Sequence, residues 1–264
     1  MIVDSVSENS IRVWTYKPKA WTDTNKILFV MHGMNRNAED YLDSWRQFAE
    51  AYRLLLVAPE FANDNFQEMS DDYQEGNVLD ASGALNPKAE WAFTVVENIF
   101  DTIIRNNQYA SYSYHIFGHS GGAQFVHRML LFLPENRIEI AIAANAGYYT
   151  FVDFDMAYPY GIGNTEIHFK SLTQSFKQKL IILLGEQDQD SNHIHLRQST
   201  AANSQGEHRL ERGTNFYQNA KEYAEQHQLD FYWQLDTIKN VGHNHHKMAS
   251  RAVMYLYQNF DKLD

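Results

Sequence analysis

Short apolar runs recur along the chain, each too short to form a helix. Their valine, isoleucine and phenylalanine content is typical of strands that are buried on both faces, as in a parallel sheet. The pattern predicts strands at residues 11–16, 26–31, 54–58, 112–117, 138–144, 180–184 and 230–235.

Helical periodicity fills the segments between the predicted strands. After Asn37, a typical N-cap residue, apolar side chains recur at positions 41, 45, 48, 49 and 52, which lie on one helical face. The same spacing predicts a helix over 92–103. A third helix is expected from Gly121 to Leu133, because Pro134 has no N–H and disfavours helical geometry in its predecessor. The last helix is expected to begin near Lys247.

Strands and helices alternate from residue 26 onward. This order predicts an α/β fold, with a mostly parallel central sheet, helices on both faces and a single domain over residues 1–264. Two long connections, 59–90 and 147–178, leave the carboxyl ends of strands, where α/β folds bind ligands. The second is rich in aromatic residues, including Tyr148 and Tyr149. These aromatic residues either wall a substrate pocket or pack together and hold the loop down.

Composition narrows the functional classes. Acidic residues outnumber basic ones by 33 to 22, and the formal charge of −11 disfavours nucleic acids and anionic membranes as partners. The absence of cysteine excludes disulfides and thiol nucleophiles. All apolar runs are far shorter than the roughly 20 residues of a membrane span. Residues 1–10 lack the pattern of a secretion signal, so we expect a cytoplasmic protein unless a signal has been trimmed.

The sharpest motif is Gly118-His119-Ser120-Gly121-Gly122, which joins a predicted strand to a predicted helix. A strand that turns directly into a helix strains the backbone of the central serine, and side chains at the flanking positions would collide. Ser120 would be exposed at the helix start, with the Gly121 N–H directed at an oxygen bound beside it. The alternative is a glycine-rich turn with an incidental serine.

A serine nucleophile needs a base to take its proton and an acid to orient that base. Carboxylates follow the strand that ends at residue 184, and Asp188 and Asp190 are both candidates for the acid. For the base we favour His243, because the glycine before it suits a tight loop that presents the ring. His245 and His246 would instead cap the following helix or face solvent.

The chain order of serine, acid and histidine resembles that of the α/β-hydrolases, from Lys26 to the end. The resemblance favours Asp188 through the family's Gly-x-x-Asp pattern. It also implies that an oxyanion is held by the N–H of Gly121 and by that of Met34, or of the neighbouring Asn35. A narrower resemblance, to esterases related to polyhydroxybutyrate depolymerases and feruloyl esterases, is carried by residues 32–36, 209–213, 216–217 and 241–243.

Further residues are expected to contact the substrate. These are His32, Asn35, His119, Tyr148 and Tyr149. Of these, His119 is expected to pack beside the serine rather than act as a base, because consecutive side chains in a tight turn point apart.

The 12 histidines of the chain permit a metal site. Imidazoles of His193, His195 and the 243–246 cluster could bind an ion together with Asp188 or Asp190. A metal hydrolase has no use for a strained serine, however. We therefore expect no functional metal and no cofactor, and a small-molecule ester as the partner.

These residues predict a serine hydrolase, most simply a carboxylesterase that cleaves a neutral ester through an acyl-enzyme. Acidic residues of the 59–90 loop would disfavour anionic substrates if they rim the pocket. Because the base must be neutral, activity should fall as the pH drops through roughly 6 to 7. A peptidase or thioesterase on the same fold, and a binding protein without catalysis, are the alternatives.

Overall fold

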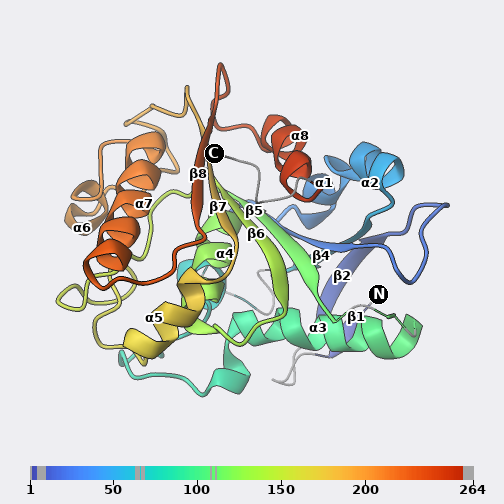
Figure 1. Ribbon diagram of the computed structural model, residues 1–264, viewed down its shortest axis with the longest axis horizontal. Coiled ribbons are helices and arrows are strands. Elements are labelled where there is room, and N and C mark those ends of the chain that lie inside the picture. Colours follow the sequence, from blue (N-terminus) through green and yellow to red (C-terminus); the bar gives the residue numbers. More distant parts are fainter. Residues whose placement is uncertain are drawn as a thin grey trace.

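The computed structural model describes residues 2–4, 10–62, 66, 69–107, 109–110 and 112–257. Through them runs an eight-stranded sheet of order β1-β2-β4-β3-β5-β6-β7-β8 (Figure 1). The first two strands pair antiparallel and the remaining ones parallel. The strands are β1 (Ile2–Asp4), β2 (Ser10–Tyr16), β3 (Ile27–Met31), β4 (Leu55–Glu60), β5 (Tyr114–His119), β6 (Ile138–Ala144), β7 (Leu180–Gly185) and β8 (Gln234–Ile238).

Helices cover both faces of this sheet (Figure 1). One face carries α1 (Ala38–Asp43), α2 (Arg46–Tyr52) and α8 (His245–Tyr255). The other face carries α3 (Ala92–Asn107), α4 (Gly121–Phe132), α5 (Phe169–Phe176) and α7 (Arg209–Gln226). Three short elements lie in the connections, namely the π-helix η1 (Met69–Gln74), the 3-10 helix η2 (Lys88–Glu90) and α6 (Thr200–Asn203).

Alternation along β3 shows why the strands read as continuous apolar runs. Ile27, Phe29 and Met31 enter the core beneath α3, α4 and α7. Leu28 and Val30 enter the core beneath α1, α2 and α8. All five side chains are fully buried, because successive residues of a strand point to opposite faces and both faces are covered. The predicted fold class is confirmed.

Several elements depart from the predicted pattern, including α5, which forms within the expected connection 147–178. The helix expected over residues 41–52 is divided, because the chain turns at Ser44 and Trp45 and the Trp45 ring packs edge-on against Phe117 of β5 at 5.0 Å. The last strand is displaced from 230–235 to Gln234–Ile238. Helix α7 was not anticipated, since most of its residues are polar. Among the described residues, no helix combines the length and apolar character that crossing a membrane requires.

The junction between β5 and α4 lies against the end of β3 with no space for added side chains. A Cβ on Gly118 would lie 2.1 Å from the carbonyl oxygen of Gly122. A Cβ on Gly122 would lie 2.2 Å from that of Met31. Because each obstacle is backbone, relief would require the sheet or the helix to move.

We predict that Gly122→Ala lowers the free energy of unfolding by about 2 kcal/mol or more, since the added methyl overpacks the junction. Chemical denaturation measures the change. Gly242→Ala is the matched control, because its Cβ would meet no atom closer than 3.6 Å, and a change within about 0.5 kcal/mol is expected there. Equal stability of the two variants would contradict the close packing.

Candidate active site

Ser120 occupies the turn between β5 and α4 in a conformation that few residues other than glycine adopt. Its φ is 57° and its ψ is −118°. The position is held by the backbone, since the Ser120 N–H donates to the Ala144 carbonyl at 2.9 Å and the Ser120 carbonyl accepts from Ala123 and Gln124. Strain of this kind persists only where surrounding structure determines it. The side chain is partly exposed at the carboxyl edge of the sheet.

Two backbone N–H groups converge beside Ser120. Gly121 begins α4, and a Cβ on it would lie 3.3 Å from the nitrogen of Met34. Among the backbone hydrogen bonds of the described residues, neither N–H has an acceptor in the protein. Two unpaired donors at a helix N-terminus provide a binding position for a negatively charged oxygen.

His32 anchors the loop that presents Met34. Its Nε2 accepts a hydrogen bond from the Phe61 N–H at 3.1 Å, so the proton lies on Nδ1, which donates to the Gly33 carbonyl at 2.8 Å. Burial lowers the pKa of His32 to about 4, which keeps the ring neutral. Tyr73 donates to the His32 carbonyl at 2.8 Å. His32 therefore lies beneath the loop and orients it, away from the cavity wall where substrate contact was expected.

Asp188 and His243 meet although 55 residues separate them. His243 Nδ1 lies 2.7 Å from Asp188 Oδ2. Asp188 is 3% exposed, whereas His243 is 20% exposed and lines the same cavity as Ser120. A hydrogen bond from Nδ1–H to the carboxylate leaves Nε2 of His243 as the nitrogen that can accept a proton.

The loops that carry these two residues are joined by backbone hydrogen bonds. The Gln187 N–H donates to Val241 at 2.8 Å, and the Glu186 N–H donates to Ile238 at 3.0 Å. Asn145, just after β6, accepts from the Gly185 N–H at 2.8 Å. The positions of acid and imidazole are thus fixed relative to β6 and β7.

Arg209, the first residue of α7, places a buried cation behind the acid. Its Nη1 lies 3.5 Å from Asp188 Oδ1, and both side chains are almost fully buried, at 1% and 3% exposed. Burial lowers the pKa of Arg209, and the neighbouring Asp188 opposes that shift. Nη2 of Arg209 lies 3.3 Å from Nδ1 of His193. Removal of either partner would leave an uncompensated buried charge.

Further imidazoles crowd His243. The His119 ring lies 4.5 Å from it, and the ring of His193 lies 5.7 Å from it. Burial lowers the pKa of His119 well below its ordinary value, helped by the nearby His243 and His245, and Tyr41 lies 3.1 Å from His119 Nδ1. His119 is therefore a neutral, buried neighbour of Ser120, as expected for a packing role.

Two cavities flank Ser120, and both include Met34 and His195 in their walls. The first, of about 290 Å³, lies on the imidazole side and is lined by Gly33, Met34, Asn35, Asn37, Asp40, Tyr41, His119, Ser120, His193, His195, His243 and His245. The second, of about 220 Å³, lies on the Gly121 side and is lined by Met34, Gln74, Ser120, Gly121, Gln124, Gly147, Tyr148, Ile194, His195, Leu196 and Arg197. We call them the imidazole cavity and the amide cavity.

The expected substrate contacts fall into two groups. Asn35 and His119 line the imidazole cavity, and Tyr148 lines the amide cavity. Tyr149, like His32, lines neither cavity; it is fully buried and stacked on Phe216 of α7 at 4.6 Å. Of these two aromatic residues, Tyr148 therefore lines a cavity beside Ser120, whereas Tyr149 packs into the core.

The other candidates for acid and base, namely Asp190, His245 and His246, form no hydrogen bond with Asp188 or His243 among the described residues. Asp190 is exposed, and its carboxylate accepts the Asn192 N–H at 2.9 Å. Helix α8 is capped by Asn244, whose Oδ1 accepts from Lys247, and not by a histidine.

Among the cavity residues that sequence analysis did not name are Gln74, Gln124 and Arg197. His193 was considered there only as a metal ligand. Gln74 and Gln124 form a hydrogen bond to each other, and Gln124 also accepts the Gly147 N–H. Nothing in the local pattern marks these positions, because they converge from η1, α4 and the β7–α7 connection only in the folded chain. Sequence analysis included Arg209 only within the segment 209–213, which resembles esterases related to polyhydroxybutyrate depolymerases.

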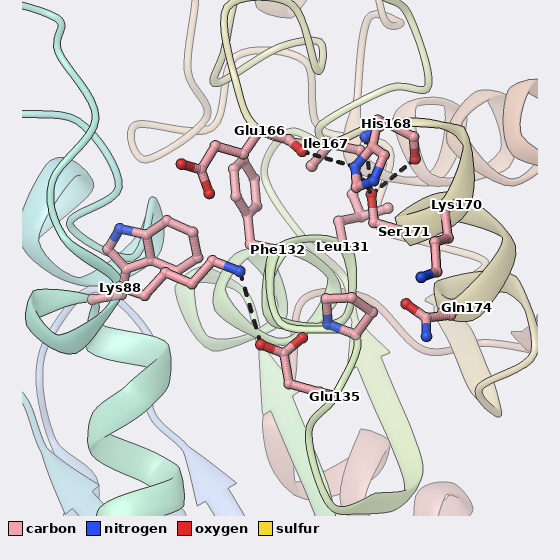
Figure 2. Close-up of a pocket in the computed structure, with 12 residues that line it drawn as sticks. Lys88, Leu131, Phe132, Glu135, Glu166, Ile167, His168, Lys170, Ser171 and Gln174 are labelled. Carbon is pink, nitrogen blue, oxygen red and sulfur yellow. Dashed lines mark hydrogen bonds and ion pairs between the residues drawn. The ribbon is translucent and has the colours of Figure 1, made fainter.

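A third cavity, of about 240 Å³, lies near the ends of η2 and α4 and the start of α5 (Figure 2). It shares no lining residue with the cavities beside Ser120. Lys88 on its wall pairs with Glu135 at 3.8 Å, and His168 pairs with Ser171. Its position excludes it from chemistry at Ser120.

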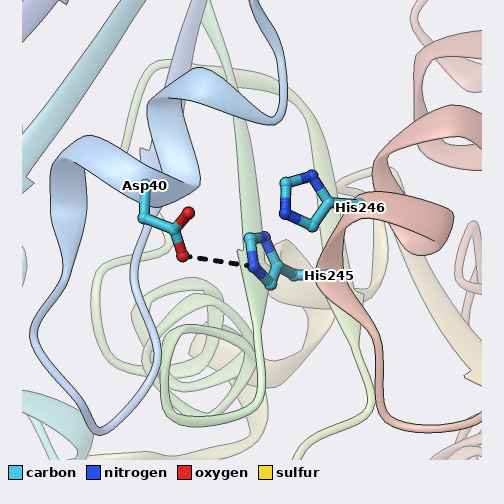
Figure 3. A group of neighbouring side chains, drawn as sticks. All are labelled: Asp40, His245 and His246. Atoms are coloured by element: carbon cyan, nitrogen blue, oxygen red, sulfur yellow. Dashed lines mark ion pairs between the residues drawn. The ribbon is translucent and has the colours of Figure 1, made fainter.

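A group with metal-binding chemistry borders the imidazole cavity. Asp40 of α1 and His245 and His246 of α8 each offer one ligand atom, and these atoms lie within 4.8 Å of one another (Figure 3). Among the described residues, no other group of three or more His, Cys, Asp or Glu side chains meets that spacing.

The fold and these residues define the class of protein. An exposed serine on a strained strand-to-helix turn, with acid and histidine after later parallel strands, is the arrangement of the α/β-hydrolases. No protein-family model and no curated protein matches the chain.

Solved structures identify its relatives. The chain is 34% identical to poly(aspartic acid) hydrolase-1 from Sphingomonas sp. KT-1, with a TM-score of 0.94 over 98% of this chain and 97% of that one. It is 28% identical to LpqC, a poly(3-hydroxybutyrate) depolymerase from Bordetella parapertussis, with a TM-score of 0.92 over 97% and 88%. An S-formylglutathione hydrolase from Agrobacterium tumefaciens, at 14% identity and a TM-score of 0.60 over 100% and 94%, shares the fold. The chain belongs to the α/β-hydrolase family of the Sphingomonas enzyme.

The buried ion pair of Arg209 and Asp188 generates a prediction about stability. Arg209→Met leaves the Asp188 carboxylate buried without its cation, so the free energy of unfolding should fall by about 3 kcal/mol or more. Chemical denaturation measures the change.

Arg209→Lys is the matched control because it retains the charge, and its free energy of unfolding should stay closer to that of the parent. Equal stability of Arg209→Met and the parent would show that the cation does not offset the buried carboxylate.

Proposed function

We propose that this protein is a serine hydrolase that cleaves carboxylic esters through an acyl-enzyme, with Ser120 as nucleophile, His243 as base and Asp188 as acid. The observation that carries the proposal is the 2.7 Å contact between His243 Nδ1 and Asp188, beside a cavity shared by His243 and strained Ser120. Strain at an exposed serine is costly and is retained where it serves chemistry.

In the first step, His243 Nε2 takes the proton of the Ser120 hydroxyl as the oxygen attacks the ester carbonyl. Asp188 holds the imidazole in the tautomer that accepts this proton and stabilises the imidazolium that forms. The carbonyl oxygen becomes negative next to the N–H groups of Met34 and Gly121, whose lack of other acceptors leaves them available. His243 then protonates the departing alcohol, and later activates water to release the acid.

The two cavities receive different parts of the substrate in this scheme. The leaving group must be protonated by His243, so it lies in the imidazole cavity. The acyl part then lies in the amide cavity, whose wall holds Gln74, Gln124 and Arg197. Arg197 Nη2 lies 3.8 Å from Glu75, so the cation is partly balanced. A small, polar, neutral acyl group fits this wall better than a long alkyl chain.

The central test is Ser120→Ala. Loss of the hydroxyl should reduce hydrolysis of a short p-nitrophenyl ester by a factor of about 10⁴ or more and abolish labelling by a fluorophosphonate probe. Ser204→Ala is the control, because that exposed hydroxyl bonds only the Ala201 carbonyl among the described residues and should leave both readouts unchanged. Labelling that persists in folded Ser120→Ala would overturn the assignment of the nucleophile.

A second candidate substrate carries a carboxylate on the acyl side, in an aspartyl amide or a succinyl-type ester. Two observations favour it. The relative at 34% identity is by name a poly(aspartic acid) hydrolase. In this chain, a guanidinium lines the amide cavity beside Tyr148, with its Nη2 3.4 Å from the phenolic oxygen. A carboxylate there would compete with Glu75 for Arg197, and guanidinium–carboxylate contacts are strong when paired.

Substitution of Arg197 separates the two substrates. Arg197→Gln should reduce kcat/KM for a monosuccinyl ester by roughly tenfold, the value of a charge-assisted hydrogen bond of about 1.5 kcal/mol, and change the butyryl ester much less. Arg105→Gln, on the exposed side of α3, controls for net charge. A parallel loss for both esters would exclude charge recognition by Arg197.

A further inference from the structure

Asp40, His245 and His246 form a compact donor set at the outer end of the imidazole cavity (Figure 3). Asp40 Oδ2 lies 3.5 Å from His245 Nε2, and the rings of His245 and His246 are 4.1 Å apart. Ligand atoms around a tetrahedral zinc ion are separated by about 3.3 Å, given metal–ligand distances near 2.0 Å. The Asp40–His245 spacing is already close to this value.

His245, the half-buried member of the set, is held in position. Tyr41 stacks on the His245 ring, with centroids 4.2 Å apart and planes at 5°. The His245 side chain is 18% exposed, and its Nε2 is the nitrogen that faces Asp40. Its Nδ1 has no hydrogen-bond partner among the described residues, so none of them fixes which nitrogen carries the proton.

The other two members can close on an ion at little cost. Asp40 and His246 are both exposed, so their side chains can rotate without disturbing the core. Asn37 Nδ2 donates to Asp40 Oδ2 at 2.8 Å, which orients the carboxylate as outer partners do in metal sites. The adjoining surface cavity is lined by Asp40 with Glu39, Asp43 and Glu60, and by one cation, Arg36. Asp43 and Glu60 are paired with Arg46 and Arg12, so Glu39 is the carboxylate that adds most to the negative charge beside Asp40.

We propose that Asp40, His245 and His246 bind a divalent transition-metal ion, with Zn²⁺ as the best match, and that the bound ion inhibits the enzyme. Two imidazoles and one carboxylate are ligands that suit zinc, and the fourth position is left for water or substrate. This ion is an inhibitor and not a cofactor of the serine chemistry.

Inhibition follows from where the ion would lie, and this part rests on the proposed function. Asp40 and His245 line the cavity that holds Ser120 and His243, so a bound ion and its water occupy the leaving-group side. During catalysis His243 becomes an imidazolium. A dication in the same cavity opposes that charge and slows acylation, whereas substrate contacts in the amide cavity stay intact.

A rival ligand set exists nearby and must be distinguished. His193 and His195 also line this cavity, with ring centroids 5.6 Å apart. His193 already contacts Arg209, whose charge disfavours a second cation. The proposed set contains a carboxylate and no guanidinium, which is why we favour it.

Titration calorimetry with ZnCl₂ in a buffer that does not chelate tests the binding directly, without reference to activity. The parent protein should bind one Zn²⁺. His246→Ala should bind at least about tenfold more weakly, since loss even of an outer partner costs that much. Asp40→Asn should also weaken binding, whereas His195→Ala and the surface variant His227→Ala should bind as the parent does.

Activity is then measured on the same proteins with a p-nitrophenyl ester. Zn²⁺ should inhibit the parent, EDTA should restore the full rate, and His246→Ala should retain the metal-free rate and resist inhibition. Unchanged Zn²⁺ affinity in both His246→Ala and Asp40→Asn would overturn the site. Inhibition that persists in His246→Ala but is lost in His195→Ala would assign it to the rival set. Zinc binding without any esterase activity would contradict the proposed function and leave the metal site supported.

Discussion

Close backbone packing at the β5–α4 junction is the constraint on which the rest of the site depends. Gly118, Gly122 and the end of β3 approach so closely that no Cβ fits between them. Ser120 adopts its positive φ within this contact, and the nitrogen of Met34 lies against the start of α4. The Ser120 side chain and the N–H groups of Met34 and Gly121, which have no backbone acceptor among the described residues, therefore lie at one closely packed junction.

The titratable side chains around this junction form two groups, with neutral ones beside Ser120 and charged ones farther from it. His32 and His119 are kept neutral by burial, so the residues nearest Ser120 add no fixed charge. The fixed charges lie one layer back, in the buried Asp188–Arg209 pair. Such a pair costs desolvation energy, but it leaves the imidazole facing a nearly neutral interior rather than an isolated anion.

The features that could be predicted from the sequence are those that depend on residues close together in the chain. The glycines around Ser120, the alternation of strands and helices, and a histidine after a glycine all depend on neighbours in the chain, and the predicted fold class was correct. Gln74, Arg197 and Arg209 come from connections whose course is decided by tertiary packing, and no periodicity marks them. The divided helix at Ser44 and Trp45 has the same origin, because the Trp45 side chain packs against a distant strand.

The start of α8 and the loop before it carry two histidines of the imidazole cavity, one that contacts Asp188 and one at the outer rim. Asn244 caps the helix by accepting the Lys247 N–H at 3.0 Å, and it stands directly between His243 and His245. One imidazole therefore precedes the cap and faces Asp188, while the other begins the helix and stacks on Tyr41. Because the cap lies between them, the start of α8 sets the separation of the two imidazoles. A cation held at the rim would share a cavity with His243 and oppose positive charge on its ring.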